Sequence, residues 1–174
     1  MFHLITGGSG SGKSAYAEQC ILNFQGSNRI YIATMYPFDE ESHRRIQRHR
    51  EMRKEKQFST IECYIGLGNL ELSSDADVLL ECMSNLTANE MYQEQGAGED
   101  TPEEILAGIE RIRKQVRNLV VVTNEVFSDG ITYDSDTMRY LSYLGQMNQE
   151  MGRMADRVTE VVYGIPVPVK SSYE

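Results

Sequence analysis

The first residues that could do chemistry form a run of glycine and serine that ends in lysine and serine. Residues 7–14 read Gly-Gly-Ser-Gly-Ser-Gly-Lys-Ser and fit the pattern G-x-x-x-x-G-K-[ST] at every fixed position. Glycines let the backbone wrap a phosphate chain with its N–H groups pointing inward, and a following helix N-terminus adds positive potential. The pattern therefore predicts a phosphate-binding loop (P-loop) made of Gly7, Gly8, Ser9, Gly10, Ser11, Gly12, Lys13 and Ser14.

The end of this loop and one later carboxylate suggest metal and phosphate chemistry. Lys13 is expected to reach the β- and γ-phosphates of a nucleotide, and the Ser14 hydroxyl to bind Mg²⁺. Glu81 ends a short apolar run, where P-loop proteins carry an acidic residue that helps to hold Mg²⁺. Alone, Glu81 could equally be an ordinary carboxylate at a strand end, and the P-loop favours the metal interpretation. We therefore expect a nucleotide to bind together with Mg²⁺, and Ser14 and Glu81 to hold the metal.

A basic segment is the second feature that could bind phosphates. From His43 to Lys56, seven of fourteen residues are Arg or Lys and two are Glu, a local charge of +5 in a chain of net charge −9. Clustered guanidinium groups suit polyphosphates, although most charge runs are only solvated helix faces. Neighbouring positive charge favours the neutral, nucleophilic form of histidine, so His49 is a candidate nucleophile toward phosphorus.

The elements that must position these residues alternate between strands and helices. Strands are predicted at 2–6, 29–34, 58–63, 78–82, 119–123 and 158–163, and helices at 13–24, 39–56, 101–117 and 135–155. Unbroken apolar strands imply burial on both faces, and helices between them imply parallel crossovers. We therefore predict an α/β, three-layer P-loop NTPase-like fold with a mainly parallel sheet, as a single nucleotide-binding domain over residues 1–174.

Three stretches carry more specific expectations. The helix at 101–117 is predicted to begin with Thr101 as N-cap, Pro102 at N1 and Glu at N3. Residues 84–98 match no element clearly, and residues 164–174 are expected to form a tail that contains Pro166 and Pro168.

Length and composition limit the partners. The 174 residues are 40% hydrophobic and 25% charged, as in a globular domain with its own core. The net charge of −9 disfavours nucleic acids and anionic membrane surfaces, so RNA binding by the basic segment is the weakest alternative. No apolar run approaches the ~20 residues of a membrane span. Three widely spaced cysteines, without a CxxC pair, favour free thiols in the cytoplasm.

Taken together and in order, the short motifs resemble one known family, the bifunctional adenosylcobinamide kinase / adenosylcobinamide-phosphate guanylyltransferases of cobalamin biosynthesis. The P-loop alone is shared by many proteins, whereas the ordered set is specific. The motifs are Thr6-Gly7-Gly8 with Ser11-Gly12-Lys13-Ser14, Tyr31-Ile32-Ala33-Thr34, Arg45-Ile46-x-x-His49-x-x-x-Arg53, Thr60-x-Glu62, Leu80-Glu81-Cys82, Asn89, Val122-Thr123-Asn124-Glu125-Val126, Gly145-x-x-Asn148-Gln149, Ala155-Asp156-x-Val158, Gly164-Ile165-Pro166 and Lys170.

The resemblance implies two activities and a set of site residues. A hydroxyl of the corrinoid adenosylcobinamide is phosphorylated with ATP or GTP, and GMP is then moved from GTP onto that phosphate. By matching position, His49 is the residue that carries GMP, and Lys13 assists catalysis. Beside the P-loop and Glu81, the matching nucleotide-contact positions are Thr34, Met35, Tyr36, Arg50, Glu51, Met52, Arg53 and Glu62. A homotrimer is implied as well.

The chain departs from the family pattern at a few positions, which leaves alternatives open. Ser9 and Gly10 replace an Ala-Arg pair, so one positive charge beside the phosphates is missing. Phe127 follows Asn-Glu-Val where the family has glycine, and Leu141 and Ser142 replace two charged residues. A kinase-only enzyme or a kinase with an altered acceptor is therefore one alternative. A non-catalytic nucleotide-binding regulator, which needs only the P-loop, is another.

Overall fold

The computed structural model describes residues 1–171, except for the side chains of Arg45, His49 and Met52. Its centre is a sheet of seven strands in the order β3-β2-β4-β5-β1-β6-β7. The first six strands in this order run parallel, and β7 pairs antiparallel with β6 at one edge. The strands are β1 (Phe2–Thr6), β2 (Arg29–Ala33), β3 (Phe58–Glu62), β4 (Asp77–Glu81), β5 (Asn118–Val122), β6 (Arg157–Val162) and β7 (Ile165–Lys170).

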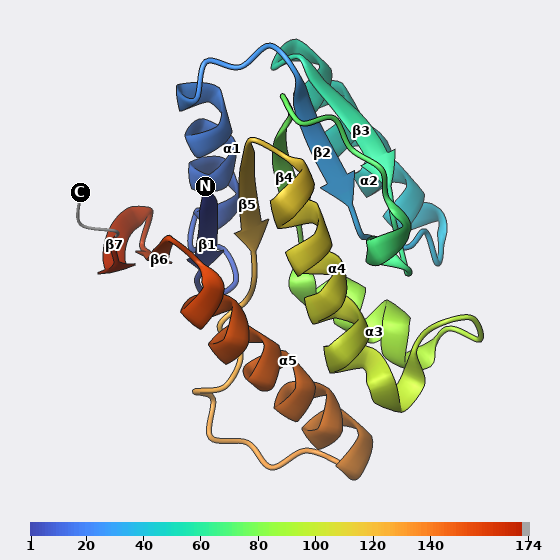
Figure 1. Cartoon of the computed structure of the whole chain (residues 1–174). Helices are drawn as coiled ribbons and strands as arrows, with labels where there is room; N and C mark the ends of the chain where they lie inside the picture. The colour runs from blue at the N-terminus through green and yellow to red at the C-terminus, as the bar shows by residue number, and fades with distance from the viewer. Residues whose placement is uncertain (172–174) are drawn as a thin grey trace.

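Helices cover both faces of the sheet (Figure 1). They are α1 (Lys13–Asn23), α2 (Glu40–Glu55), α3 (Met83–Tyr92), α4 (Thr101–Gln115) and α5 (Ser135–Met154), with 3₁₀ turns η1 (Leu67–Asn69) and η2 (Gly98–Asp100). One apolar core packs α3, α4 and α5 against the sheet, and a smaller core on the opposite face packs α1 against it. The predicted three-layer, mainly parallel α/β fold is therefore confirmed.

Two elements were not predicted. The segment left unassigned at 84–98 contains α3, whose inward face includes Thr87, Asn89 and Glu90 among its buried residues, and these polar residues hide the apolar periodicity. The expected tail instead forms β7, despite its prolines. A strand at the edge of a sheet tolerates proline because one of its sides needs no backbone donors. The turn between β6 and β7 places Tyr163 and Gly164 in the left-handed region, at φ 52° and 76°.

The predicted start of α4 was wrong by one residue. Thr101 is not the N-cap but the first helical residue, with φ −51° and ψ −47°, and Asp100 precedes it as the cap. The 3₁₀ turn η2 leads directly into the helix, so the Thr101 hydroxyl donates back to the Gly98 carbonyl at 2.7 Å. The remaining predicted helices and strands agree with the structure within about two residues.

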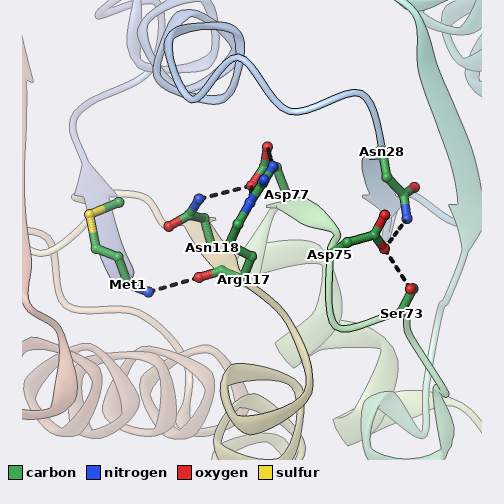
Figure 2. Close-up of polar contacts among 7 residues, drawn as sticks. All are labelled: Met1, Asn28, Ser73, Asp75, Asp77, Arg117 and Asn118. Carbon is green, nitrogen blue, oxygen red and sulfur yellow. Dashed lines mark hydrogen bonds and ion pairs between the residues drawn. The ribbon is translucent and has the colours of Figure 1, made fainter.

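At the amino ends of the central strands, a buried carboxylate ties the sheet together (Figure 2). Asp77 is fully buried at the start of β4 and accepts hydrogen bonds from Arg117 Nε at 3.0 Å, Arg117 Nη2 at 2.6 Å and Asn118 Nδ2 at 2.8 Å. The terminal amine of Met1 donates to the Arg117 carbonyl at 2.9 Å. A Cβ atom added to Gly26 would lie 1.9 Å from both partners of this pair, so the turn before β2 requires glycine here. The P-loop lies at the opposite ends of the strands, where the carboxyl ends of the parallel strands meet.

Inside the sheet, His3 of β1 predicts a specific dependence of stability on pH. Its ring is 5% exposed and lies 2.8 Å from the Thr159 hydroxyl, and burial together with the nearby Arg157 charge lowers its pKa from 6.5 to about 4. The unfolded chain takes up this proton as the pH falls through 6.5, and the folded chain only near pH 4. Folding stability is therefore lost on acidification between these two values.

We expect the free energy of unfolding to fall by roughly 2–3 kcal/mol between pH 7 and pH 4 because of this one group. Urea unfolding of the wild type and of His3→Gln at several pH values measures it. The variant should lack that part of the pH dependence. If the free energy of unfolding changed with pH equally in both proteins, the assignment to His3 would be contradicted.

Candidate functional site

The P-loop occupies the turn between β1 and α1, as the sequence predicted. Gly12 precedes α1 with φ 91°, a left-handed conformation that a side chain would disfavour. The Ser11 carbonyl accepts a hydrogen bond from the Gly164 backbone N–H at 2.8 Å, so the turn between β6 and β7 supports the loop from one side. Lys13 Nζ donates to the Gly8 carbonyl at 3.0 Å, which keeps the ammonium group at the loop. The Ser11 hydroxyl is buried without a partner among the described residues.

Ser14 and Glu81, predicted to share a metal, are in direct contact. The Ser14 hydroxyl donates to Glu81 Oε1, and the Tyr31 hydroxyl donates to Glu81 Oε2 at 3.0 Å. Burial and the Glu81 charge raise the pKa of Tyr31 well above 10, so its hydroxyl stays a donor. Among the described residues, no cluster of three His, Cys, Asp or Glu side chains could bind a metal unaided. One hydroxyl and one carboxylate nevertheless fit Mg²⁺, which keeps several waters and takes its remaining oxygens from nucleotide phosphates.

Thr34 and the residues after it lie beside this pair. The Thr34 hydroxyl donates to the Cys82 carbonyl at 2.9 Å and accepts from the Cys82 backbone N–H at 2.8 Å, while Asn89 Nδ2 donates to the Thr34 carbonyl at 2.8 Å. The Thr34 side chain therefore joins β2 to β4. Met35 lines a small cavity of about 100 Å³ that also contacts Glu81.

Tyr36 extends this region outward. Its ring is 37% exposed and lies 5.1 Å from that of Tyr64 and 5.0 Å from that of Phe38, measured between ring centroids. Tyr36 lines a cavity of about 320 Å³ together with Phe38 and Ser42.

The basic segment forms α2, which begins after Asp39. The Asp39 side chain accepts from the Ser42 backbone N–H at 2.7 Å and caps the helix. A cleft of about 660 Å³ lies between this helix and the carboxyl end of β3. Its lining residues are Pro37, His43, Arg44, Ile46, Gln47, Arg48, Arg50, Glu51, Glu62 and Tyr64.

Within this cleft the structure brings together some of the predicted residues and separates others. Arg50 forms an ion pair with Glu62, and Glu51 lies beside them. Arg53 does not line the cleft: it is 4% exposed, and its guanidinium carbon lies 3.7 Å from the centroid of the Tyr31 ring. His49 and Met52 belong to α2 by their backbone, and their side chains lie outside the described residues.

The P-loop and the α2 cleft lie at different places along the edge of the sheet. The P-loop follows β1, Glu81 ends β4 and Glu62 ends β3, and the strand order places β1 and β3 four positions apart. At about 4.8 Å per strand, these two ends are roughly 19 Å apart. The predicted residues thus form two groups, one around the P-loop and one around α2, with Glu81 and Tyr31 between them.

A comparison with protein-family models decides the family. The model described as cobinamide kinase / cobinamide phosphate guanyltransferase matches residues 3–169. The chain belongs to this family.

Individual relatives agree with this assignment. The bifunctional adenosylcobalamin biosynthesis protein CobU of Salmonella typhimurium is 32% identical, over 98% of this chain and 100% of the relative. CobU of Escherichia coli is also 32% identical, with the same coverage. The corresponding CobP of Pseudomonas aeruginosa is 30% identical, over 98% of each chain. The resemblance inferred from the ordered motifs is therefore confirmed.

Among solved structures, the crystal structure of the flagellar accessory protein FlaH from Methanocaldococcus jannaschii is similar in fold. Its TM-score is 0.52 at 11% identity, with 98% of this chain and 78% of that chain covered. At 11% identity, the likeness to FlaH supports the α/β fold of this chain and nothing further. Among the described residues, none of its helices combines the length and the apolar character needed to span a membrane.

Sequence reasoning missed Tyr31 as a site residue, although it quoted the motif that contains it. The signal lay in strand register. Ala33 of β2 pairs with Glu81 of β4, and side chains alternate between faces with a period of two, so Tyr31 shares a face with Glu81. Without the strand order the register was not available, and a tyrosine in an apolar strand is usually a core residue.

Removing the P-loop ammonium group should weaken nucleotide binding specifically. We expect Lys13→Ala to raise the Kd for GTP and Mg²⁺ roughly 10- to 100-fold, because charge-assisted hydrogen bonds contribute about 1.5–3 kcal/mol. Calorimetric titration measures the Kd. Lys114→Ala, on the exposed face of α4, is the matched control and should bind as the wild type does. Equal loss in both variants would contradict the placement of the phosphates at Lys13.

Proposed function

We propose that this protein phosphorylates a hydroxyl of adenosylcobinamide with ATP or GTP and then transfers GMP from GTP to the new phosphate, giving adenosylcobinamide-GDP. The single observation that supports this most is the contact between Ser14 and Glu81 at an intact P-loop, in a chain that matches the family over residues 3–169. We further propose that residues 1–174 work as one nucleotide-binding domain.

In the kinase step, the P-loop would hold the triphosphate. Its backbone N–H groups and the N-terminus of α1 face the phosphates, and Lys13 would neutralise charge that develops on the transferred group. Ser14 and Glu81 would hold Mg²⁺, which when bound shields the phosphate oxygens from the incoming nucleophile. The acceptor hydroxyl attacks the γ-phosphorus, its proton is released, and the nucleoside diphosphate leaves.

In the guanylyl transfer, His49 would be the nucleophile. A ring nitrogen attacks the α-phosphorus of GTP, an N–P bond forms, and pyrophosphate leaves. The phosphate of the first product then attacks the same phosphorus, so the N–P bond breaks and GMP is passed on. Arg50, in the α2 cleft, would neutralise the phosphate oxygens, and its ion pair with Glu62 holds it in position.

One departure from the family pattern, Leu141, lines another cleft, which favours the altered-acceptor enzyme as the second candidate. A cleft of about 530 Å³ follows β5 and is lined in part by Glu125, Tyr133 and Leu141. It adjoins the P-loop, since the Glu125 backbone N–H donates to the Gly7 carbonyl at 3.1 Å. If this cleft holds the acceptor, Leu141 would change which acceptor is phosphorylated without disturbing the nucleotide.

A labelling experiment tests the guanylyl step. Incubation with GTP labelled at the α-phosphate should give a protein adduct that is stable in base and labile in acid, as expected for an N–P bond. His49→Ala should give no adduct. Lys54→Ala, exposed on α2 and outside the lining of the cleft, should be labelled as the wild type is.

The outcomes separate the candidates. Labelling together with a GDP-linked corrinoid supports the bifunctional enzyme. Phosphorylated corrinoid without any adduct would reduce the proposal to a kinase. Nucleotide binding without turnover of any acceptor would overturn both activities in favour of the regulator.

We also propose that the protein is a cytoplasmic homotrimer. Nucleoside triphosphate substrates and three free cysteines suit a reducing, nucleotide-rich compartment. The edge strand β7 exposes three apolar side chains, Ile165, Val167 and Val169, at 63, 43 and 63%. An exposed apolar strand at a sheet edge is typical of a surface that another chain covers.

Light scattering after size exclusion should give about three times the chain mass of 19.8 kDa. Val169→Lys should shift this mass toward one chain while the circular dichroism spectrum stays unchanged. The control is Glu94→Lys, at an exposed position after α3, which should leave the mass unchanged. A wild-type mass of one chain would contradict the trimer.

A further inference from the structure

Helix α2 meets the sheet through an unusual residue. Of the α2 side chains that the structure describes, Arg53 alone is fully buried. Its guanidinium group lies over the Tyr31 ring at 3.7 Å, and its Nε atom has no hydrogen-bond partner among the described residues. A buried cation is costly unless its surroundings compensate it, and an aromatic face does so. The carboxyl-terminal half of α2 therefore packs on the sheet through the contact between Arg53 and the Tyr31 ring.

The hydroxyl end of the Tyr31 side chain is connected to the P-loop region through Glu81. Tyr31 lies in β2 and is 6% exposed, and its hydroxyl donates to Glu81 Oε2 at 3.0 Å. The second oxygen of Glu81 accepts from Ser14 at the start of α1. A carboxylate held at both oxygens has one orientation, whereas a carboxylate held at one oxygen can rotate. Tyr31 thus contacts both Glu81, which is bonded to Ser14 beside the P-loop, and Arg53 of α2.

We propose that Tyr31 is a positioning residue for both halves of the site: its hydroxyl directs the Glu81 carboxylate toward Ser14, and its ring seats Arg53, one helical turn after His49. The proposal rests on the proposed function and adds a residue to it. It assigns different tasks to two parts of one side chain, so the tasks can be removed one at a time.

The hydroxyl is tested by Tyr31→Phe, which keeps the ring and removes the hydrogen bond. The probe is binding of a fluorescent GTP analogue as a function of Mg²⁺ concentration, which needs no turnover. We expect the Mg²⁺ concentration for half-maximal binding to rise roughly five- to tenfold, as for the loss of one hydrogen bond to a charged group. Glu81→Gln should shift it at least as far. A wild-type Mg²⁺ dependence in Tyr31→Phe would overturn the role of the hydroxyl.

The ring is tested by Tyr31→Leu, with trypsin cleavage within residues 40–55 as the readout. We expect cleavage to be about fivefold faster than in Tyr31→Phe, because Arg53 loses its contact with an aromatic ring and α2 is then held less firmly on the sheet. The matched control is Phe58→Leu, which removes a buried aromatic ring of β3 that packs edge-on against Tyr31 at 6.3 Å between ring centroids. The Phe58 side chain has no polar atom that could bond to Glu81, and in the described part of the chain the Arg53 guanidinium group lies over Tyr31 and not over Phe58.

Cleavage of Phe58→Leu should stay near the wild-type rate. Equal acceleration in Phe58→Leu and Tyr31→Leu would mean ordinary loss of packing and would overturn the role of the ring. Because both readouts are independent of turnover, they fail separately from the proposed function, which fails if the wild type transfers neither phosphate nor GMP.

Discussion

The carboxylate of Glu81 is the point on which the arrangement of the site depends. It ends the buried strand β4 and accepts from two hydroxyl groups, one on the first turn of α1 and one on β2. Through these two bonds, three elements far apart in the sequence are fixed relative to each other. Low local polarity makes such charge-assisted bonds stronger than they would be in water, and makes the loss of either donor costly.

The sheet explains why the site is divided. In a parallel sheet all the strands present their carboxyl ends on one side, so the P-loop after β1 and the beginning of the basic helix α2 after β2 necessarily lie on that side. The strand order β3-β2-β4-β5-β1 sets β1 four strands apart from β3, at whose end the α2 cleft lies. A nucleotide held at one group does not automatically reach the other. An enzyme with two successive transfers can use this division, since each transfer needs its own approach to phosphorus.

Most of the fold was accessible from the sequence because its strands are short, unbroken apolar runs separated by segments long enough for helices. Two of these helices, α2 and α5, also begin after an aspartate that caps them. What could not be predicted depended on tertiary context. Helix α3 buries Thr87, Asn89 and Glu90 through specific hydrogen bonds, so its pattern did not look amphipathic. Strand β7 contains two prolines, which only its edge position permits. In the site, Ser14 was expected from the motif and Glu81 from its place at a strand end. Arg53 was expected among the nucleotide contacts, and its burial against Tyr31 depends on tertiary packing that the sequence does not show.

The hydrogen bond between the Gly164 amide and the Ser11 carbonyl bears on how the protein can be engineered. It attaches the phosphate loop to the last hairpin of the chain, whose final strand ends at Lys170, close to the C-terminus. The hairpin of β6 and β7 is therefore not a neutral attachment point for a label or a crosslink. A label on β7 that distorts the hairpin would also disturb the P-loop, because the turn that donates to the Ser11 carbonyl directly precedes this strand.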